Sequence, residues 1–340
     1  MELCVITGDG VSHEVIPAAV EVLKTVLPTV EIYPAAAGFE HYKAYGTSLP
    51  QETLDLALHC RAVLFGAADS PSYTVEGYFS PIIALRQHLN TYANIRPSRY
   101  LPVATARKGV DLIVVRENTE DFYLVDEITE PDGQTSSARK VITRGATERV
   151  SHMSYQLARQ AGRERVTIVH KANVLPQSDG LFRRVALEVA QQYPDIETDE
   201  LLVDTAAYWM VKDPTRFDMI LTSNLYGDIL SDMAAAWGGG LGMIPALNLG
   251  DDAAIAEPLH GSAPDISGKG IANPTAAIRS VAMLLRHHWQ RHDLADRIED
   301  AIRLTLEQGG YTVDILMDGA MNTEAFTERV IGHLLASHAG

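Results

Sequence analysis

The chain has 340 residues, of which 46% are hydrophobic and 21% are charged, a composition typical of soluble globular proteins with a large core. Its 28 Lys and Arg residues against 44 Asp and Glu residues give a formal net charge of −16. Because so acidic a chain repels nucleic-acid phosphates, a nucleic-acid partner is not expected. An anionic small-molecule substrate is compatible, since a few arginines can make one cleft locally positive.

Short apolar runs alternate with segments of helical periodicity along the chain. They predict strands at residues 3–7, 30–33, 62–65, 112–116, 166–170 and 219–222, and helices at 13–27, 50–58, 82–92, 151–161, 181–192, 228–237, 275–288, 296–306 and 325–335. This alternation predicts an α/β fold with a largely parallel sheet. Residues 131–137 are polar and indicate a hairpin or arm, and the glycine-rich residues 237–242 suit a linker between lobes.

Neither a disulfide framework nor a membrane segment is indicated. The two cysteines, Cys4 and Cys60, are too few for such a framework, and both lie in or beside apolar runs. The first residues contain no basic region followed by a cleavage site, and no run of about 18 uncharged apolar residues occurs. We therefore expect buried thiols, no membrane partner and a cytoplasmic location.

The first glycine-rich segment, Gly8-Asp9-Gly10, follows the opening strand. A dinucleotide-binding fingerprint would need a third glycine three residues on, where this chain has His13. The segment therefore predicts a structural turn at the end of a strand.

Three arginines, Arg86, Arg96 and Arg116, lie on or beside predicted elements. The planar guanidinium group donates two parallel hydrogen bonds to a carboxylate. If the three converge, they would bind a di- or tricarboxylic acid; if not, they are ordinary surface arginines.

Asp228 and Asp232 are four residues apart on a predicted helix and therefore share one face. Like charges at this spacing repel each other unless a cation lies between them, and carboxylates suit Mg²⁺ or Mn²⁺. The alternative is a solvated acidic face. Lys171, at the end of a predicted strand, is either a base with a pKa lowered by burial or a lysine that extends to the surface.

Residues 260–274 form a glycine-rich loop before a predicted helix. Backbone N–H groups in such a loop can bind phosphate, and Asp265 could accept hydrogen bonds from ribose hydroxyls. The alternative is a loop that binds no ligand.

Taken together, these segments resemble the β-decarboxylating dehydrogenases, which comprise isocitrate, homoisocitrate, 3-isopropylmalate and tartrate dehydrogenases. The resemblance covers nearly the whole chain, and homoisocitrate dehydrogenases are the most similar branch. It is carried by Gly8-Asp9-Gly10, Leu85-Arg86, Tyr92-Ala-Asn-Ile-Arg96-Pro97, Val115-Arg116-Glu117-Asn118-Thr119-Glu120, His170-Lys171-Ala-Asn173-Val, Asn224-Leu-Tyr-Gly-Asp228-Ile-Leu-Ser-Asp232, His260-Gly-Ser-Ala-Pro-Asp265-Ile266 and Asn322-Thr323-Glu324-Ala325-Phe326-Thr327.

This resemblance implies the isocitrate/isopropylmalate dehydrogenase-like fold, which has two α/β lobes around a cleft and is not a Rossmann fold. The implied cofactor-binding lobe is discontinuous, residues 1–91 plus 240–340, and residues 92–239 form the substrate, metal and dimerisation lobe. The family also implies a homodimer or homotetramer with shared active sites, because Lys171 and Asp204 would come from the neighbouring subunit.

The resemblance implies roles for matching residues as well. Tyr123 looks like the catalytic tyrosine that protonates the enolate, and Lys171 like the catalytic lysine that assists removal of the C2 hydroxyl proton. The implied substrate-binding residues are Arg86, Arg96, Arg116, Tyr123, Ser70, Ser80, Ile82 and Ile83. The implied ligands of Mg²⁺ or Mn²⁺ are Asp204, Asp228 and Asp232, and the implied NAD-binding residues are Asn173, His260, Gly261, Ser262, Ala263, Pro264, Asp265, Ile266 and Asn273.

In this family NAD⁺ takes a hydride from C2 of a 2-hydroxy acid, and the resulting β-keto acid loses CO₂. Relatives that use NADP have Lys-Tyr where this chain has Asp265-Ile266. A carboxylate at residue 265 would repel the 2′-phosphate of NADP, so NAD is expected.

The expected substrate is a 3-substituted malate, a hydroxy di- or tricarboxylate. Different segments of the chain favour different substituents at its C3 atom. Glu117-Asn-Thr-Glu-Asp and Asn224-Leu-Tyr-Gly resemble the isocitrate and homoisocitrate branch, which is our first expectation. Ile82 and Ile83 instead resemble the hydrophobic pocket of isopropylmalate enzymes, beside which an unpaired carboxylate would be costly. The hydrogen-bond donors that could compensate are Ser70, Ser72, Tyr73 and Ser80.

The alternatives are 3-isopropylmalate, tartrate or another malate analogue as substrate, and a non-catalytic regulatory subunit. A regulatory subunit would be expected to lack metal ligands or the tyrosine and lysine. The chain retains all of them, so an enzyme is expected: Tyr123, Lys171, Asp204, Asp228 and Asp232.

Overall fold

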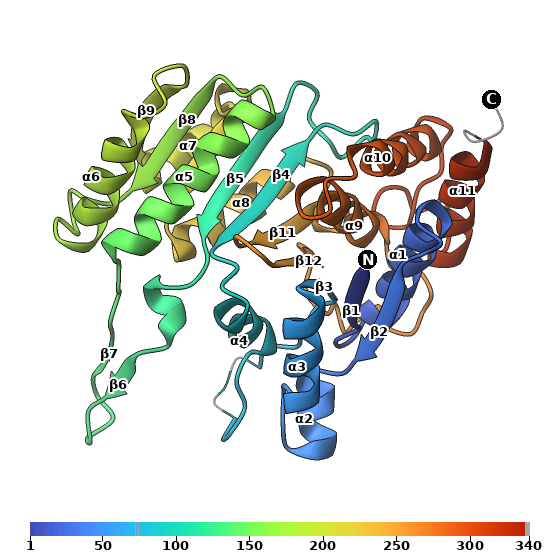
Figure 1. Cartoon of the computed structure of the whole chain (residues 1–340), viewed down its shortest axis with the longest axis horizontal. Helices are drawn as coiled ribbons and strands as arrows, with labels where there is room; N and C mark the ends of the chain where they lie inside the picture. Colours follow the sequence, from blue (N-terminus) through green and yellow to red (C-terminus); the bar gives the residue numbers. More distant parts are fainter. Residues whose placement is uncertain (72, 74, 337–340) are drawn as a thin grey trace. The chain divides into compact units, whose positions relative to one another are not determined.

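The computed structural model describes residues 1–71, 73 and 75–336. Its internal contacts divide the chain into two compact units. Unit 1 comprises Met1–Asn90, Tyr100–Lys108 and the chain from Ala235 onward, and unit 2 comprises Thr91–Arg99 and Gly109–Ala234. Both units combine helices with mostly parallel strands, which confirms the α/β prediction (Figure 1).

Two short segments group differently from the lobes expected from the sequence. Residues 100–108 and 235–239 lie in unit 1. Backbone hydrogen bonding accounts for this, because the Arg107 N–H donates to the Trp237 carbonyl at 2.8 Å. The Thr105 hydroxyl likewise donates to the Gly239 carbonyl at 2.9 Å, so the two segments stay together.

Unit 1 contains five strands whose spatial order is β2-β1-β3-β12-β11. The β11–β12 pair is antiparallel, whereas the pairings of β1 with β2, β1 with β3 and β3 with β12 are parallel. The elements are β1 (Glu2–Ile6), α1 (Ser12–Val26), β2 (Glu31–Ala35), α2 (Phe39–Tyr45), α3 (Gln51–Cys60), β3 (Ala62–Phe65), α4 (Pro81–His88), the 3₁₀ turn η3 (Leu241–Met243), β11 (Pro245–Leu249), β12 (Ala254–Pro258), α9 (Thr275–His287), α10 (His292–Glu307) and α11 (Thr323–Ala336).

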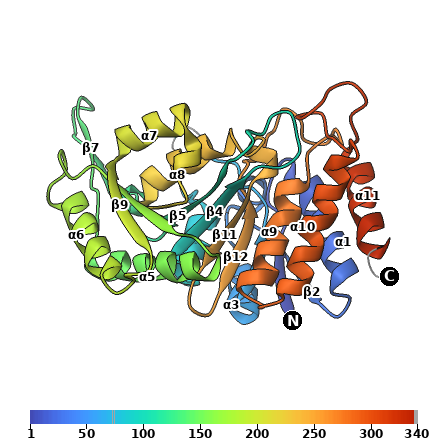
Figure 2. The same ribbon diagram turned by 90° about the horizontal axis from the view of Figure 1, so that it is seen from above.

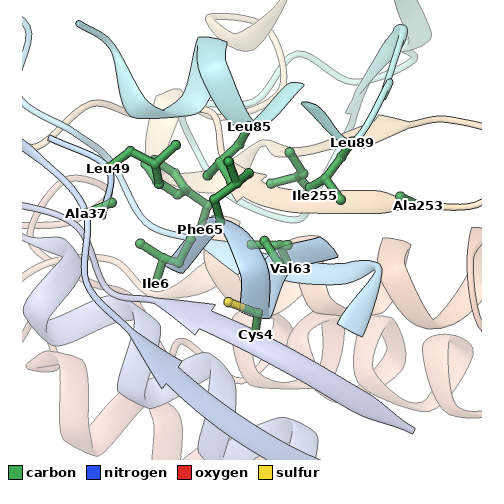
Figure 3. Close-up of a cluster of buried hydrophobic side chains, with 12 residues drawn as sticks. Cys4, Ile6, Ala37, Leu49, Val63, Phe65, Leu85, Leu89, Ala253 and Ile255 are labelled. Carbon is green, nitrogen blue, oxygen red and sulfur yellow. The ribbon is translucent and has the colours of Figure 1, made fainter. Parts of the chain in front are cut away.

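One core of unit 1 lies between its strands and helices α3 and α4 (Figure 3). Phe65 is 1% exposed and packs with Leu85 of α4, with Leu89 just after this helix and with Ile255 of β12. Helix α9 packs against β11, β12, α1 and α10. The β1–α1 turn is structural as predicted, since the Asp9 carboxylate accepts hydrogen bonds from backbone N–H groups at the start of α2.

Unit 2 has the strand order β4-β5-β10-β8-β9. Strands β4 and β5 are antiparallel, and the other pairs are parallel. The elements are β4 (Ala93–Arg99), β5 (Asp111–Glu117), the 3₁₀ turn η1 (Asp121–Leu124), β6 (Glu127–Thr129), β7 (Ser136–Ala138), α5 (Arg144–Gln160), β8 (Arg165–His170), α6 (Ser178–Ala190), β9 (Glu197–Leu202), α7 (Val203–Lys212), the 3₁₀ turn η2 (Pro214–Arg216), β10 (Met219–Thr222) and α8 (Asn224–Ala235).

Helices cover both faces of the unit 2 sheet (Figure 2). Helices α5 and α6 pack together and against β5 and β8, while α7 contacts β8 and β9. Strands β6 and β7 form a separate antiparallel hairpin, which confirms the predicted polar arm. Within the described part of the chain, no helix is both long enough and apolar enough to cross a membrane.

Candidate active site

Asp228, on α8, is where several predicted site residues of unit 2 meet. Its Oδ1 atom accepts a hydrogen bond from Arg96 Nη1 at 3.1 Å and forms an ion pair with Arg116. Its Oδ2 atom accepts one from the Tyr123 hydroxyl at 2.6 Å. Two guanidinium groups and a phenol, from β4, β5 and η1, therefore converge on one carboxylate.

Close packing of α8 against β5 brings these groups together. A Cβ atom added at Gly227 would lie 2.6 Å from both Cβ and Cγ of Arg116. Only glycine lets the helix approach the strand this closely. Asp228, the next residue along, is thereby held beside the Arg116 side chain.

Arg116 is 1% exposed, yet one of its donors is unused. Its Nε donates to Asn224 Oδ1 at 2.8 Å, and its guanidinium carbon lies 4.7 Å from the Tyr123 ring centre. Its Nη2 atom is buried and has no hydrogen-bond partner among the described residues. Because buried donors are nearly always satisfied, this N–H group is suited to a carboxylate ligand.

Asp232 lies one turn beyond Asp228 on α8, and its Oδ1 atom is 3.7 Å from Arg96 Nη1. Burial raises the pKa of Asp232; the charge of Arg96 lowers it, and that of Asp228 raises it. Both carboxylates remain partly exposed, at 38% and 57% of the side chain. Such a pair can bind a divalent cation, which would relieve the repulsion between the two charges.

Lys171 and Asp204 form a different pair in unit 2. Lys171 follows β8, and its Nζ atom donates to Asp204 on α7. Their side chains are 24% and 62% exposed. Among the described residues no three His, Cys, Asp or Glu side chains form a metal-binding group, so the structure does not bring Asp204 into one cluster with Asp228 and Asp232.

Arg86, the third predicted substrate arginine, belongs to unit 1. Its Nη2 atom donates to Glu257 Oε1 at 2.6 Å, and Asn248 donates to the same oxygen at 2.9 Å. Arg86 is 6% exposed, and its Nε atom has no hydrogen-bond partner among the described residues. Glu257 thus fixes one side of this guanidinium group and leaves one N–H unused.

The start of α4 carries the residues expected to contact the substrate substituent. Ser80 is the N-cap residue, but its side chain makes no capping hydrogen bond. Ile82 packs against the core around Phe65, which explains its apolar character without a ligand. Ile83 is half-buried and points about 100° away around the helix. Ser70 is exposed, and Ser72 lies outside the described residues.

The loop predicted to bind NAD borders a pocket of about 150 Å³ in unit 1. His260 Nδ1 lies 2.9 Å from the Gly261 carbonyl oxygen, whereas its Nε2 atom is buried with no hydrogen-bond partner in the described part of the chain. Burial lowers the pKa of His260 and so favours the neutral ring. The pocket lining includes Val11, His260, Ala263, Ile266, Asn273 and Asp314.

The remaining predicted cofactor residues differ in position. Gly261, Ala263, Pro264 and Asp265 are exposed, whereas Ser262 is buried. The Ser262 carbonyl accepts a hydrogen bond from the Val11 N–H at 2.8 Å and so fixes the loop to the β1–α1 turn. Asn173 is exposed in the turn after β8, in unit 2, and does not line this pocket.

Comparisons with known proteins show the family of the chain. The family model described as isocitrate/isopropylmalate dehydrogenase matches residues 2–330. The chain belongs to this family.

Several relatives match almost the entire length of this chain. An isocitrate/homoisocitrate dehydrogenase of Thermus thermophilus is 48% identical over 97% of both chains. A 3-isopropylmalate/3-methylmalate dehydrogenase of Methanocaldococcus jannaschii is 45% identical over 97% of both chains. The crystal structure of isocitrate dehydrogenase from Methylococcus capsulatus superposes with a TM-score of 0.94 at 40% identity, covering 98% of this chain and 99% of that one. The predicted resemblance and fold are confirmed, and the chain is a member of a family of dehydrogenases.

Sequence reasoning did not assign a role to several residues that contact the site of this dehydrogenase family member. Asn224 donates to the Glu120 carbonyl at 3.0 Å while it accepts from Arg116. Ser231 accepts a hydrogen bond from Arg96 at 2.7 Å. Both lie in the Asn224–Asp232 motif, so their position in that motif was the available signal.

Proposed function

We propose that this protein catalyses the NAD-dependent oxidative decarboxylation of a 3-substituted malate, with Mg²⁺ or Mn²⁺. The observation that carries the proposal is the cluster around Asp228, in which two buried arginines and a tyrosine surround a carboxylate. Cationic groups of this kind bind substrate carboxylates, and the acidic pair on α8 suits a hard cation. Membership of a dehydrogenase family supports the redox step.

Asp228 and Asp232 would hold the divalent cation from one chain. When bound, the cation would supply stabilisation of negative charge on the C2 oxygen, and NAD⁺ would supply the hydride acceptor. Asp204 is the third ligand in this proposal. Because it lies with Lys171 and apart from the pair on α8, it serves the site of a second copy of the chain.

The chain's own side chains orient the substrate and move the protons. Arg96 and Arg116 bind its carboxylates, and Arg116 uses the N–H group that has no hydrogen-bond partner among the described residues. Lys171 takes the C2 hydroxyl proton, and Tyr123 delivers a proton to the enolate carbon after CO₂ leaves. Since Tyr123 donates to Asp228, its hydroxyl is fixed beside the bound substrate.

The NAD site in this proposal is the pocket beside the 260–273 loop. The His260 Nε2 atom, which has no partner in the described part of the chain, can hydrogen-bond the nucleotide base of NAD, and Ile266 provides an apolar wall. The exposed Asp265 carboxylate accepts from free ribose hydroxyls and repels a 2′-phosphate. The residues present therefore fit NAD better than NADP.

For the substrate, we favour the homoisocitrate and isocitrate branch, which the Glu117 and Asn224 motifs support. 3-Isopropylmalate is a second candidate because half-buried Ile83 offers an apolar surface at the start of α4. The packing of Ile82 in the core weakens the case for a pocket built from both isoleucines.

We also propose a homodimer or homotetramer. Exposed apolar side chains on α7 and α8, namely Tyr208, Val211 and Ile229, are 54–61% exposed and suit contact with another copy. A mixture of Lys171→Met and Asp228→Asn chains tests the shared site. Half of the dimers are mixed, and each mixed dimer keeps one of two sites intact, so about a quarter of wild-type activity returns.

The first experiment is NADH formation with Mg²⁺, comparing kcat/KM for isocitrate, homoisocitrate, 3-isopropylmalate and tartrate. The matched variant is Asp228→Asn, which we expect to lose turnover while it still binds NAD. If no substrate turns over although NAD and Mn²⁺ bind, the proposed reaction is wrong. If only NADP supports turnover, the cofactor assignment is wrong.

A further inference from the structure

We infer that Asp179 and Lys140 are positioning residues for Lys171 and Tyr123. Their described hydrogen bonds and ion pairs include none to the proposed substrate-binding arginines or metal ligands. This inference rests on the proposed function, in which Lys171 and Tyr123 transfer the protons. It starts from a buried polar cluster in unit 2, defined as Asp121, Lys140, Asp179 and Tyr226. We call it the Lys140 cluster.

Lys140 is the centre of this cluster. Its Nζ atom donates to Asp179 Oδ1 at 2.6 Å and lies 3.8 Å from Asp121 Oδ1. It also lies 4.2 Å from the centre of the Tyr226 ring, within cation–π range. The three charged side chains, Lys140, Asp179 and Asp121, are 6%, 2% and 0% exposed, so these contacts are shielded from water.

Asp179 connects the cluster to Lys171. Its second oxygen, Oδ2, accepts a hydrogen bond from the backbone N–H of Lys171 at 2.6 Å. Lys171 is the first residue beyond β8, where the hydrogen bonds of the sheet end. Asp179 therefore holds the backbone of the proposed base from α6, a neighbouring element.

Asp121 connects the cluster to Tyr123. Its Oδ1 atom accepts from the Phe122 N–H at 2.9 Å, and its Oδ2 atom accepts from the Leu225 N–H at 3.1 Å. Asp121 has a φ of 75°, a conformation that is costly for a residue other than glycine. The surrounding contacts keep η1 in this conformation, and η1 carries the Tyr123 phenol.

Lys140 also lies where the segment from Asp121 to Val141 closes, and this segment carries both Tyr123 and the β6–β7 hairpin. The Asp121 N–H donates to the carbonyl of Val141 at 2.9 Å, so the two ends of the arm meet beside Lys140. Replacing a buried ion pair by apolar residues is often neutral for stability. In this inference the pair serves the geometry of Lys171 and Tyr123.

A matched control lies at the opposite end of the same strand. Asp218 accepts hydrogen bonds from the backbone N–H groups of Glu164 at 2.7 Å and Arg165 at 3.1 Å, at the start of β8. Arg163 Nη1 donates to it at 2.9 Å. Asp218 thus combines a backbone contact to β8 with an ion pair, as Asp179 does, but far along the strand from Lys171.

The test compares Asp179→Ala with Asp218→Ala in the full-length protein. For Asp179→Ala we expect kcat to fall about ten- to hundredfold with KM within about threefold, since Asp179 positions a group without touching substrate. Asp218→Ala should lower Tm less, because Asp218 is 23% exposed and Arg163 keeps its ion pair with Asp111, and it should leave kcat within about twofold. Asp179→Asn, which keeps an oxygen acceptor for the Lys171 N–H, should restore part of kcat.

A readout independent of turnover separates this inference from the proposed function. Hydrogen exchange of the peptide that contains Lys171 should be at least tenfold faster in Asp179→Ala than in Asp218→Ala, even if no malate derivative is a substrate. If Asp179→Ala fails to fold, the double variant Lys140→Met/Asp179→Leu, which removes both charges, should fold and show the same loss of kcat. Equal exchange in the two alanine variants, or unchanged kcat in the double variant, would overturn the inference.

Discussion

The close approach of α8 to β5 predicts a large effect of adding one methyl group, in Gly227→Ala. The new Cβ atom would lie 2.6 Å from Cβ and Cγ of Arg116, whereas ordinary contacts begin at 3.4 Å. Helix and strand must therefore separate by about 0.8 Å. Both Arg116 atoms are near its backbone, so a side-chain rotation cannot relieve the overlap.

That displacement also breaks a specific hydrogen bond. The Arg116 Nε–Asn224 Oδ1 distance of 2.8 Å would grow to roughly 3.6 Å, beyond hydrogen-bonding range. Overpacking costs about 1–3 kcal/mol and a lost hydrogen bond to a charged group about 1.5–3 kcal/mol. The higher helix propensity of alanine stabilises the variant by about 1 kcal/mol. We expect a net loss of about 1.5–5 kcal/mol and, because Arg116 moves, a higher KM for the substrate.

Thermal unfolding and steady-state kinetics check this prediction. The matched control is Gly145→Ala on α5, where an added Cβ has no neighbour within 4 Å. That variant should gain about 0.5–1 kcal/mol from helix propensity and keep its KM. If Gly227→Ala is as stable as Gly145→Ala and has the same KM, the close approach does not hold Arg116 in place.

Three further predictions concern protonation and cofactor choice. Burial raises the pKa of Glu120 from 4.5 to about 7, so the ionised form destabilises the fold as the pH rises through this range. Glu120→Gln should remove that part of the pH dependence of Tm between about pH 4.5 and 7, and parallel curves for the two proteins would contradict this. Burial raises the pKa of Cys4 to about 12, so iodoacetamide should label half-buried Cys60 first and Cys4 only on unfolding; equal labelling rates in the native protein would be inconsistent with this. Asp265→Asn should raise kcat/KM with NADP relative to NAD, measured by the ratio of the two, and an unchanged ratio would remove Asp265 from cofactor selection.

Elements with strong periodicity were predictable from the sequence, whereas those shaped by long-range pairing were not. The helix expected at 82–92 ends at His88 because Asn90 adopts a left-handed φ of 50°. Strand β4 was missed since its buried side chains include polar ones and a proline, which hide the apolar pattern of a strand. Strand β9 was missed because its mixed polar sequence is only half-buried.

In the candidate site, too, some residues could be predicted from the sequence and others could not. Arg96, Arg116 and Asp228 belong to recognisable motifs, and the structure brings all three together. Lys140 and Asp179 lie outside these motifs, and their contact joins residues 39 apart in sequence. Spacing along the chain cannot indicate such a contact, because it depends on how the arm and α6 pack.

The division of the chain also determines when each part can fold during synthesis. Strand β3 needs β12 as its parallel neighbour, and the core around Phe65 includes Ile255. At about 5–20 residues per second, the roughly 190 residues between these strands take the ribosome about 10–40 s. Unit 2 has all its residues once Ala234 has emerged, before β12 is made. Until β12 is made, the apolar faces of the N-terminal strands therefore stay uncovered. We expect nascent chains of this length to depend on chaperones.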